Sequence, residues 1–248
     1  MSAEFRLGIQ SYCFRKFQPL SALVDCLNQV GLEYVELWPG HLDFQAPEDE
    51  IRTGLQQVRD AGLTVDSYGT VGLDADEEKT RALLEVCRTA GLDAVTIGDV
   101  APAAYEMTQA LCEEYDINLA FHNHGRRHRL GSFDALEDLF EQTSPRFGLC
   151  LDTAWALDSD EDPVAGVDRF ADRLYGVHLK DFTFDEEGRP EDVIIGTGGL
   201  DLPALMGRLD AIDFSGFLSL EYEGNPDDPM DEVQECMQAV KEAIAALD

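Results

Sequence analysis

The chain has 248 residues, of which 44% are hydrophobic, and this length and composition fit a globular protein with a sizeable core. Fifty acidic residues face 18 basic ones, for a formal net charge of −32 at pH 7, which argues against nucleic acid as a partner. No apolar run approaches the roughly 20 residues that cross a bilayer, so no membrane association is expected.

Short β-rich runs alternate with amphipathic helical stretches about eight times along the chain. The runs lack strict polar alternation, which is typical of parallel strands that are covered by helices on their outer face. The predicted strands are, in chain order, Leu7–Cys13, Tyr34–Trp38, Thr64–Tyr68, Ala94–Gly98, Leu119–His124, Phe147–Asp152, Leu174–Lys180 and Phe217–Tyr222.

The stretches between these strands predict helices. The first covers residues 20–30 and ends at Gly31, and the next two end before Gly62 and Gly91. Ser132 is a candidate N-cap for the fifth helix. The remaining helices are expected near residues 101–115, 133–142, 163–173, 202–211 and 229–247. The alternation predicts an α/β protein, a (β/α)₈ TIM barrel that forms a single domain over residues 1–248, with a doubly wound open sheet as the alternative.

Polar side chains gather where the predicted strands end, and in such barrels the chemistry lies at the C-terminal ends of the strands. A lone histidine at a strand end is usually a structural residue, but imidazoles and carboxylates from four successive strands predict a metal site. Residues two apart in a strand share a face, so several of these pairs point together into the barrel mouth. The residues concerned are Glu36, His41, His122, His124, Asp152, His178, Lys180, Glu221 and Glu223.

Aromatic residues near the same ends are candidates for a sugar-binding floor. The expected substrate-binding residues are Tyr12, Trp38, His41, Trp155 and Glu223. A basic run, Arg126, Arg127 and Arg129, follows the fifth predicted strand. A solvated loop and a phosphate clamp are both compatible with this run, and the first is favoured.

These motifs resemble the xylose isomerase-like TIM-barrel superfamily, often called sugar phosphate isomerases/epimerases. The resemblance runs along most of the chain and includes Tyr-Val-Glu-Leu-Trp-Pro-Gly-His, His-Asn-His-Gly and Val-His-Leu-Lys-Asp-Phe. It implies one divalent ion (Mn, Zn, Co or Mg) held by Asp152, His178 and Glu221, with His122 where many relatives have a glutamate. In the 3-epimerases that glutamate is one of two acid/base carboxylates, so the histidine puts a symmetrical epimerisation in doubt. Trp155 stands where relatives often have a histidine.

The resemblance and the residues together predict a metal-dependent sugar isomerase or epimerase that acts on a keto-sugar or polyol through a metal-stabilised enediolate. Glu221 or Glu36 is the expected base, Lys180 the expected oxyanion partner, and His124 and His41 the expected proton shuttles. The nearest alternative is a metal-dependent dehydratase or lyase of a keto-polyol, resembling inosose dehydratase or a 3-keto-sugar lyase. A DNA-repair endonuclease is disfavoured by the charge, and a non-catalytic sugar-binding barrel remains a further alternative.

The setting of the protein is also predicted. An acidic surface with only four lysines is typical of proteins that work in molar salt, where the Debye length falls to about 3 Å. We therefore expect a halophilic protein. The start of the sequence has no basic stretch followed by an apolar one, so we also expect the protein to be cytoplasmic. The six scattered cysteines are expected to be reduced core thiols. The predicted partner is a small carbohydrate, and a homo-oligomer is one expectation because relatives are often dimers or tetramers.

Overall fold

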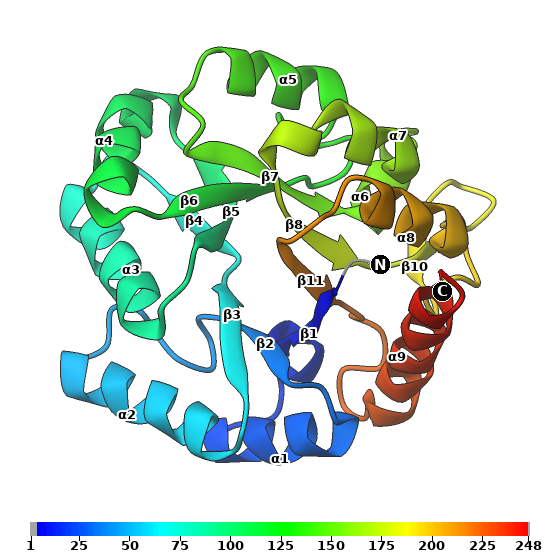
Figure 1. Cartoon of the computed structure of the whole chain (residues 1–248), viewed down its shortest axis with the longest axis horizontal. Coiled ribbons are helices and arrows are strands. Elements are labelled where there is room, and N and C mark those ends of the chain that lie inside the picture. The colour runs from blue at the N-terminus through cyan, green and yellow to red at the C-terminus, as the bar shows by residue number, and fades with distance from the viewer. Residues whose placement is uncertain (1–3, 248) are drawn as a thin grey trace.

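A computed structural model describes residues 4–247, and its strands form a ring that is surrounded by helices (Figure 1). Every neighbouring pair in the nine-stranded sheet is parallel, in the order β3-β2-β1-β11-β8-β7-β6-β5-β4. The strands are β1 (Arg6–Gln10), β2 (Tyr34–Leu37), β3 (Thr64–Tyr68), β4 (Val71–Leu73), β5 (Ala94–Val100), β6 (Asn118–His122), β7 (Phe147–Asp152), β8 (Leu174–Leu179) and β11 (Phe217–Leu220).

The two ends of this order, β3 and β4, are consecutive in the chain and are separated only by Gly69 and Thr70. They share one position in the wall of the barrel, because β4 pairs with β5 and β3 also contacts β5. The sheet therefore closes, which confirms the predicted (β/α)₈ barrel and excludes the doubly wound open sheet.

Helices cover the outside of the ring, as the alternation predicts (Figure 1). Gly31 and Gly91 end α1 and α3 in the left-handed conformation, and the Ser132 side chain caps α5 by accepting from the Ala135 amide. The helices are α1 (Leu20–Val30), α2 (Glu48–Asp60), α3 (Glu77–Ala90), α4 (Tyr105–Tyr115), α5 (Phe133–Glu141), α6 (Thr153–Asp158), α7 (Pro163–Arg169), α8 (Leu202–Ala211) and α9 (Met230–Ala245). No helix within residues 4–247 is long and apolar enough to cross a membrane.

Several predicted strands end one to three residues too late. β1 stops at Gln10, whose side chain accepts from the Tyr12 amide and starts a short 3₁₀ helix, η1 (Ser11–Phe14). β6, β8 and β11 stop at His122, Leu179 and Leu220, so the polar residues that follow lie in the loops at the barrel mouth. The predicted helices over residues 101–115 and 163–173 each contain a separate 3₁₀ turn, η2 (Pro102–Ala104) and η3 (Ala171–Arg173).

Three elements were not predicted from the sequence: β4, α6 and the hairpin of β9 (Phe182–Phe184) and β10 (Pro190–Asp192). α6 begins because the Asp152 side chain accepts from the Trp155 amide and caps the helix. The hairpin turns at Asp185, whose carboxylate accepts from two backbone amides of the turn. All six cysteines are buried free thiols, as expected.

The barrel interior holds a buried carboxyl at its N-terminal end. Asp66 on β3 is 6% exposed, and neither of its oxygens has a hydrogen-bond partner among residues 4–247. Burial, with the nearby charge of Glu36, raises its pKa from 3.8 to about 7. Because the unfolded chain releases this proton at lower pH than the folded one, the group costs stability as pH rises from about 4 to 7, and the cost stays constant above that.

We predict that Asp66→Asn raises the free energy of unfolding at pH 8, by at most roughly 4 kcal/mol. The gain should fall by more than half at pH 5, where the native carboxyl is neutral. Denaturant unfolding at both pH values, with a chelator present throughout, measures this. Asp93→Asn is the control, because Asp93 is exposed and lines the same cavity at this end of the barrel. A gain that does not depend on pH would contradict the assignment.

Candidate metal centre

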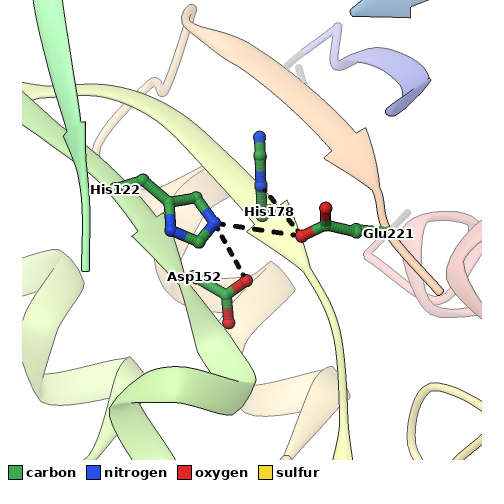
Figure 2. Close-up of side chains that lie close together, drawn as sticks. All are labelled: His122, Asp152, His178 and Glu221. Carbon is green, nitrogen blue, oxygen red and sulfur yellow. Dashed lines mark hydrogen bonds and ion pairs between the residues drawn. The ribbon is translucent and has the colours of Figure 1, made fainter. Parts of the chain in front are cut away.

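Four strands that neighbour one another in the wall bring two imidazoles and two carboxylates together (Figure 2). His122 ends β6, Asp152 ends β7, His178 lies near the end of β8, and Glu221 follows β11. One ligand atom from each residue lies within 4.8 Å of the others, and all four residues are buried. The structure thus brings together the four residues predicted as metal ligands.

The contacts within this group run between imidazole nitrogens and carboxylate oxygens. His122 Nε2 lies 3.2 Å from Asp152 Oδ2 and 3.8 Å from Glu221 Oε2. His178 Nδ1 lies 3.2 Å from the same Glu221 oxygen. Asp152 Oδ2 is buried and makes no hydrogen bond within the described part of the chain, although it forms the ion pair with His122. A buried carboxylate oxygen that faces other donor atoms without a hydrogen bond is well suited to a cation.

Neighbouring side chains fix the ligands in place. Asn123 accepts from the Asp152 amide at 2.8 Å and donates to the Asp152 carbonyl at 2.9 Å, which fastens the end of β6 to the end of β7. The Thr153 hydroxyl accepts from the Lys180 amide at 3.0 Å and so joins the ends of β7 and β8. These bonds join the strand ends that carry His122, Asp152 and His178.

Glu36 holds the outer side of one ligand. Its carboxylate accepts from His178 Nε2 at 2.7 Å, and both side chains are fully buried. With this nitrogen protonated, His178 presents the lone pair of Nδ1 to the centre, which is the usual arrangement of a metal-binding histidine and its carboxylate partner. Glu36 therefore lies behind the ligand shell, where it positions His178, and not on the cavity surface where a base would stand.

The field of the site favours positive charge. Burial alone would lower the pKa of His122 and His178, but neighbouring groups raise both pKa values overall. For His122 these groups are Asp152 and Glu221. For His178 they are Cys150, Glu36 and Glu221. Burial would raise the pKa of Glu221, but Lys180 and His178 hold it well below the usual range. Glu221 thus stays ionised and attracts a cation.

Lys180 supplies the one ammonium group beside these carboxylates in the described chain. It is fully buried, lies 3.9 Å from Glu221 Oε2 and 3.9 Å from Asp192 Oδ1, and forms a closer ion pair with Glu223. Burial would lower its pKa, yet the carboxylates raise it, so the group is charged. Its Nζ also lies 5.8 Å from the ring centre of Trp155. Lys180 therefore sits behind the carboxylates of the site and holds Glu221 and Glu223 in place.

A cavity of about 270 Å³ adjoins the ligand group, and two of the candidate ligands, His122 and Glu221, line it. The expected substrate-binding residues Tyr12, Trp38, Trp155 and Glu223 line it, together with His124. Gln10, the last residue of β1, and Thr70, in the link between β3 and β4, also line it, and no sequence motif marked either as a site residue. His41, also predicted, is not among the residues that line this cavity: its ring nitrogens lie 3.2 Å from the Ser11 hydroxyl and 3.2 Å from the Phe14 carbonyl.

His124 follows β6 and turns back into the cavity. Its Nδ1 lies 3.1 Å from the His122 carbonyl, so Nδ1 carries the proton and Nε2 keeps its lone pair. The ring centre lies 4.5 Å from that of His122. Burial and the neighbouring His122 lower the pKa of His124 to about 3, which keeps the ring neutral. A neutral imidazole with one open nitrogen therefore stands beside the ligand group.

The donor set fits a divalent metal ion. Two imidazole nitrogens and two carboxylates suit Zn²⁺, Mn²⁺ or Co²⁺ better than Mg²⁺, which prefers oxygen donors and keeps several waters. Asp152 Oδ2, which accepts no hydrogen bond from residues 4–247, and the carboxylate on the far side of His178 are both features of such centres. The described residues thus form a group that can bind a metal.

Fold and site together define a (β/α)₈ barrel with a candidate metal centre at its C-terminal mouth. Residues 24–242 match the family model for the xylose isomerase-like TIM barrel, and the chain belongs to this family.

Similar proteins include enzymes of more than one kind. The inosose dehydratase of Geobacillus kaustophilus (strain HTA426) is 28% identical over 227 residues, which cover 81% of this chain and 70% of that protein. The IOLI protein, crystallised with a bound zinc atom, has a TM-score of 0.81 at 13% identity, with 98% and 99% of the two chains covered. An L-ribulose 3-epimerase has a TM-score of 0.76 at 18% identity, with 98% and 95% covered. These two structures share the fold.

We predict that the protein binds about one divalent ion per chain, and that His178→Ala and Glu221→Gln each weaken binding by at least about tenfold, because each removes a ligand. Calorimetric titration with Mn²⁺ and metal analysis after dialysis measure this. His128→Ala is the matched control, since His128 is a half-buried histidine of the neighbouring loop outside the ligand group. Equal Mn²⁺ affinity in all four proteins would contradict the assignment.

Proposed function

We propose that the protein is a metal-dependent enzyme that removes a proton next to the ketone of a small keto-polyol and then expels a β-hydroxyl group, which makes it a dehydratase. The observation that carries this proposal is the open imidazole of His124 beside the four-ligand group, in the same cavity. The identity with inosose dehydratase supports the same reaction class.

A bound divalent ion would supply Lewis acidity, which polarises a ketone and acidifies the neighbouring C–H. His122, Asp152, His178 and Glu221 would hold it. The chain itself has to position the polyol and move one proton. Tyr12, Trp38 and Trp155 offer ring surfaces to the apolar faces of the polyol, and Gln10 and Glu223 offer hydrogen-bonding groups to its hydroxyls.

His124 is the proposed proton carrier. Its Nε2 lone pair takes the proton from the carbon next to the ketone, which leaves an enediolate and an imidazolium. The imidazolium then returns that proton to the β-hydroxyl oxygen, the C–O bond breaks, and water leaves. The imidazole ring of His124 ends neutral, as it began. A single group therefore serves both proton transfers.

The histidines after β6 favour elimination over a symmetrical epimerisation. An epimerase of this kind needs acid/base groups on both faces of one carbon, and in the resembling epimerases two carboxylates fill these roles. Here β6 ends in His122, and Glu36, which the sequence also predicts as a base, accepts from His178 behind the ligand shell. Among the cavity-lining groups, Glu221 belongs to the ligand group and Glu223 is paired with Lys180, so His124 is the proposed proton-transfer group.

We predict that the Mn²⁺-loaded protein converts an inosose to an unsaturated ketone, seen as a rise in ultraviolet absorbance. His124→Gln should keep full Mn²⁺ binding and lose turnover by about 10²- to 10⁴-fold, the usual contribution of a positioned acid/base group. His128→Gln is the matched control, because the His128 ring lies 5.3 Å from that of His124 but does not line the cavity beside the ligand group, where the uncharged inosose would bind. Unchanged turnover in His124→Gln would rule out the proposed carrier.

Epimerisation or isomerisation is the second candidate, supported by the shared fold with L-ribulose 3-epimerase. In D₂O it would place deuterium beside the ketone of the recovered keto-polyol without any absorbance change. Deuterium incorporation that needs Mn²⁺ and Glu221, but gives no unsaturated product, would assign this activity in place of dehydration. The absence of both signals with inososes and ketoses would contradict metal-dependent enolisation altogether.

A further inference from the structure

A second cavity, of about 540 Å³, adjoins the metal cavity at the barrel mouth. His124 and Trp155 line both cavities and therefore form the boundary between them. The metal cavity alone lies below the usual range of ligand pockets, roughly 300–1,000 Å³, whereas the two together fall within it. A ligand with its ketone over the four ligands can extend past His124 and Trp155 into the second cavity.

Arginines dominate the second cavity in a chain that is otherwise strongly acidic. Its lining includes Arg126, Arg127 and Arg189 and only two acids, Asp158 and Glu187. Both acids are already engaged: Asp158 Oδ1 lies 2.9 Å from Arg126 Nη2, and Glu187 Oε2 lies 3.0 Å from Arg189 Nη2. Arg189 also pairs with Asp185, so Arg127 is the one arginine of this lining that forms no ion pair within the described residues.

Arg127 makes no hydrogen bond or ion pair within the described residues, although its two arginine neighbours in the loop do. Arg126 is held by Asp158 and by the Gly188 carbonyl, and Arg129 is held by Asp99 and the Val100 carbonyl. Arg127 is exposed at the cavity and acts on the nearby Asp158 only through its charge, so its guanidinium donors are available to a ligand.

The loop that carries Arg127 is built tightly against the site. Gly125 has φ +37°, and a Cβ there would lie 2.3 Å from Asp158 Oδ2 and 2.8 Å from Trp155. Only glycine lets the backbone approach this closely, and the Arg126 amide then donates to Asp158 Oδ2 at 2.9 Å. The Asp158 side chain is itself buried, so it fixes the backbone of the loop just before Arg127.

We propose that this second cavity is an anion subsite, in which Arg127, between Arg126 and Arg189, binds a carboxylate or phosphate group of the substrate. The proposal rests on the proposed function, because it takes the ketone end of the same molecule to lie over the metal centre. The substrate class that follows is an acidic keto-polyol, either a sugar acid or a sugar phosphate. Guanidinium suits both groups because its planar donors match their paired oxygens.

Three ketoses with one carbon skeleton test the subsite: D-fructose, D-fructuronate and D-fructose 6-phosphate, which end in a hydroxymethyl, a carboxylate and a phosphate. Dissociation constants are measured by calorimetry on the Mn²⁺-loaded full chain at one fixed salt concentration. We expect one or both charged ketoses to bind about 10- to 100-fold more tightly than D-fructose. A gain for D-fructuronate alone identifies a carboxylate subsite, and a gain for the phosphate alone identifies a phosphate subsite.

Arg127→Gln should abolish this preference and leave the affinity for D-fructose unchanged. Lys241→Gln is the matched control, because it removes one exposed positive charge on α9, outside the lining of this cavity. Equal binding of the three ketoses by the wild-type protein, or a preference that survives Arg127→Gln, would overturn the proposal.

Deuterium exchange beside the ketone, measured in the same samples, separates this proposal from the proposed function. Charge-selective binding without exchange would leave the subsite standing and count against the enolisation chemistry. Exchange without charge selectivity would do the reverse.

Discussion

The structure of the barrel mouth depends on a group of buried carboxylates that lie beside one lysine. Asp152, Glu36 and Glu221 are buried around two imidazoles, and Lys180 is the ammonium group among them. Ionised carboxylates in a low-dielectric interior are costly unless they are paired or coordinate a metal. The raised pKa of both ligand histidines reflects the same field, because a site that attracts protons to imidazole also attracts a divalent cation.

The barrel fold fixes the positions of these carboxylates and imidazoles. Parallel strands place their C-terminal ends at one rim, so β6, β7, β8 and β11 each need to supply only one ligand. Asn123 and Thr153 join neighbouring strand ends, and Glu36 orients His178 from a strand on the other side of β11 and β1. The carboxylate of Asp152 also caps α6, which carries Trp155 to the cavity wall. One side chain thereby links the ligand group to the boundary of the second cavity.

The sequence predicted the parts of the site that depend on strand order, and it failed where side-chain direction depends on tertiary packing. His122, Asp152, His178 and Glu221 stand at the ends of clear strand patterns, and parallel strands in a barrel must bring such ends together. No local sequence pattern distinguishes a carboxylate that faces the cavity from one that contacts the outer nitrogen of a metal-binding histidine, as Glu36 does with His178. The hairpin of β9 and β10, which brings Asp192 to Lys180, has only three residues in each strand, too few for an alternating pattern to identify it.

The central claim is that the two imidazoles and two carboxylates bind one cation directly. X-ray absorption of the Zn²⁺-loaded protein tests it most directly, because ring scattering counts the coordinated imidazoles. The account predicts two imidazole nitrogens at about 2.0–2.1 Å, with carboxylate oxygens completing the shell, and one imidazole fewer in His178→Ala. A spectrum with only oxygen ligands, or one that is identical in the variant, would contradict the claim.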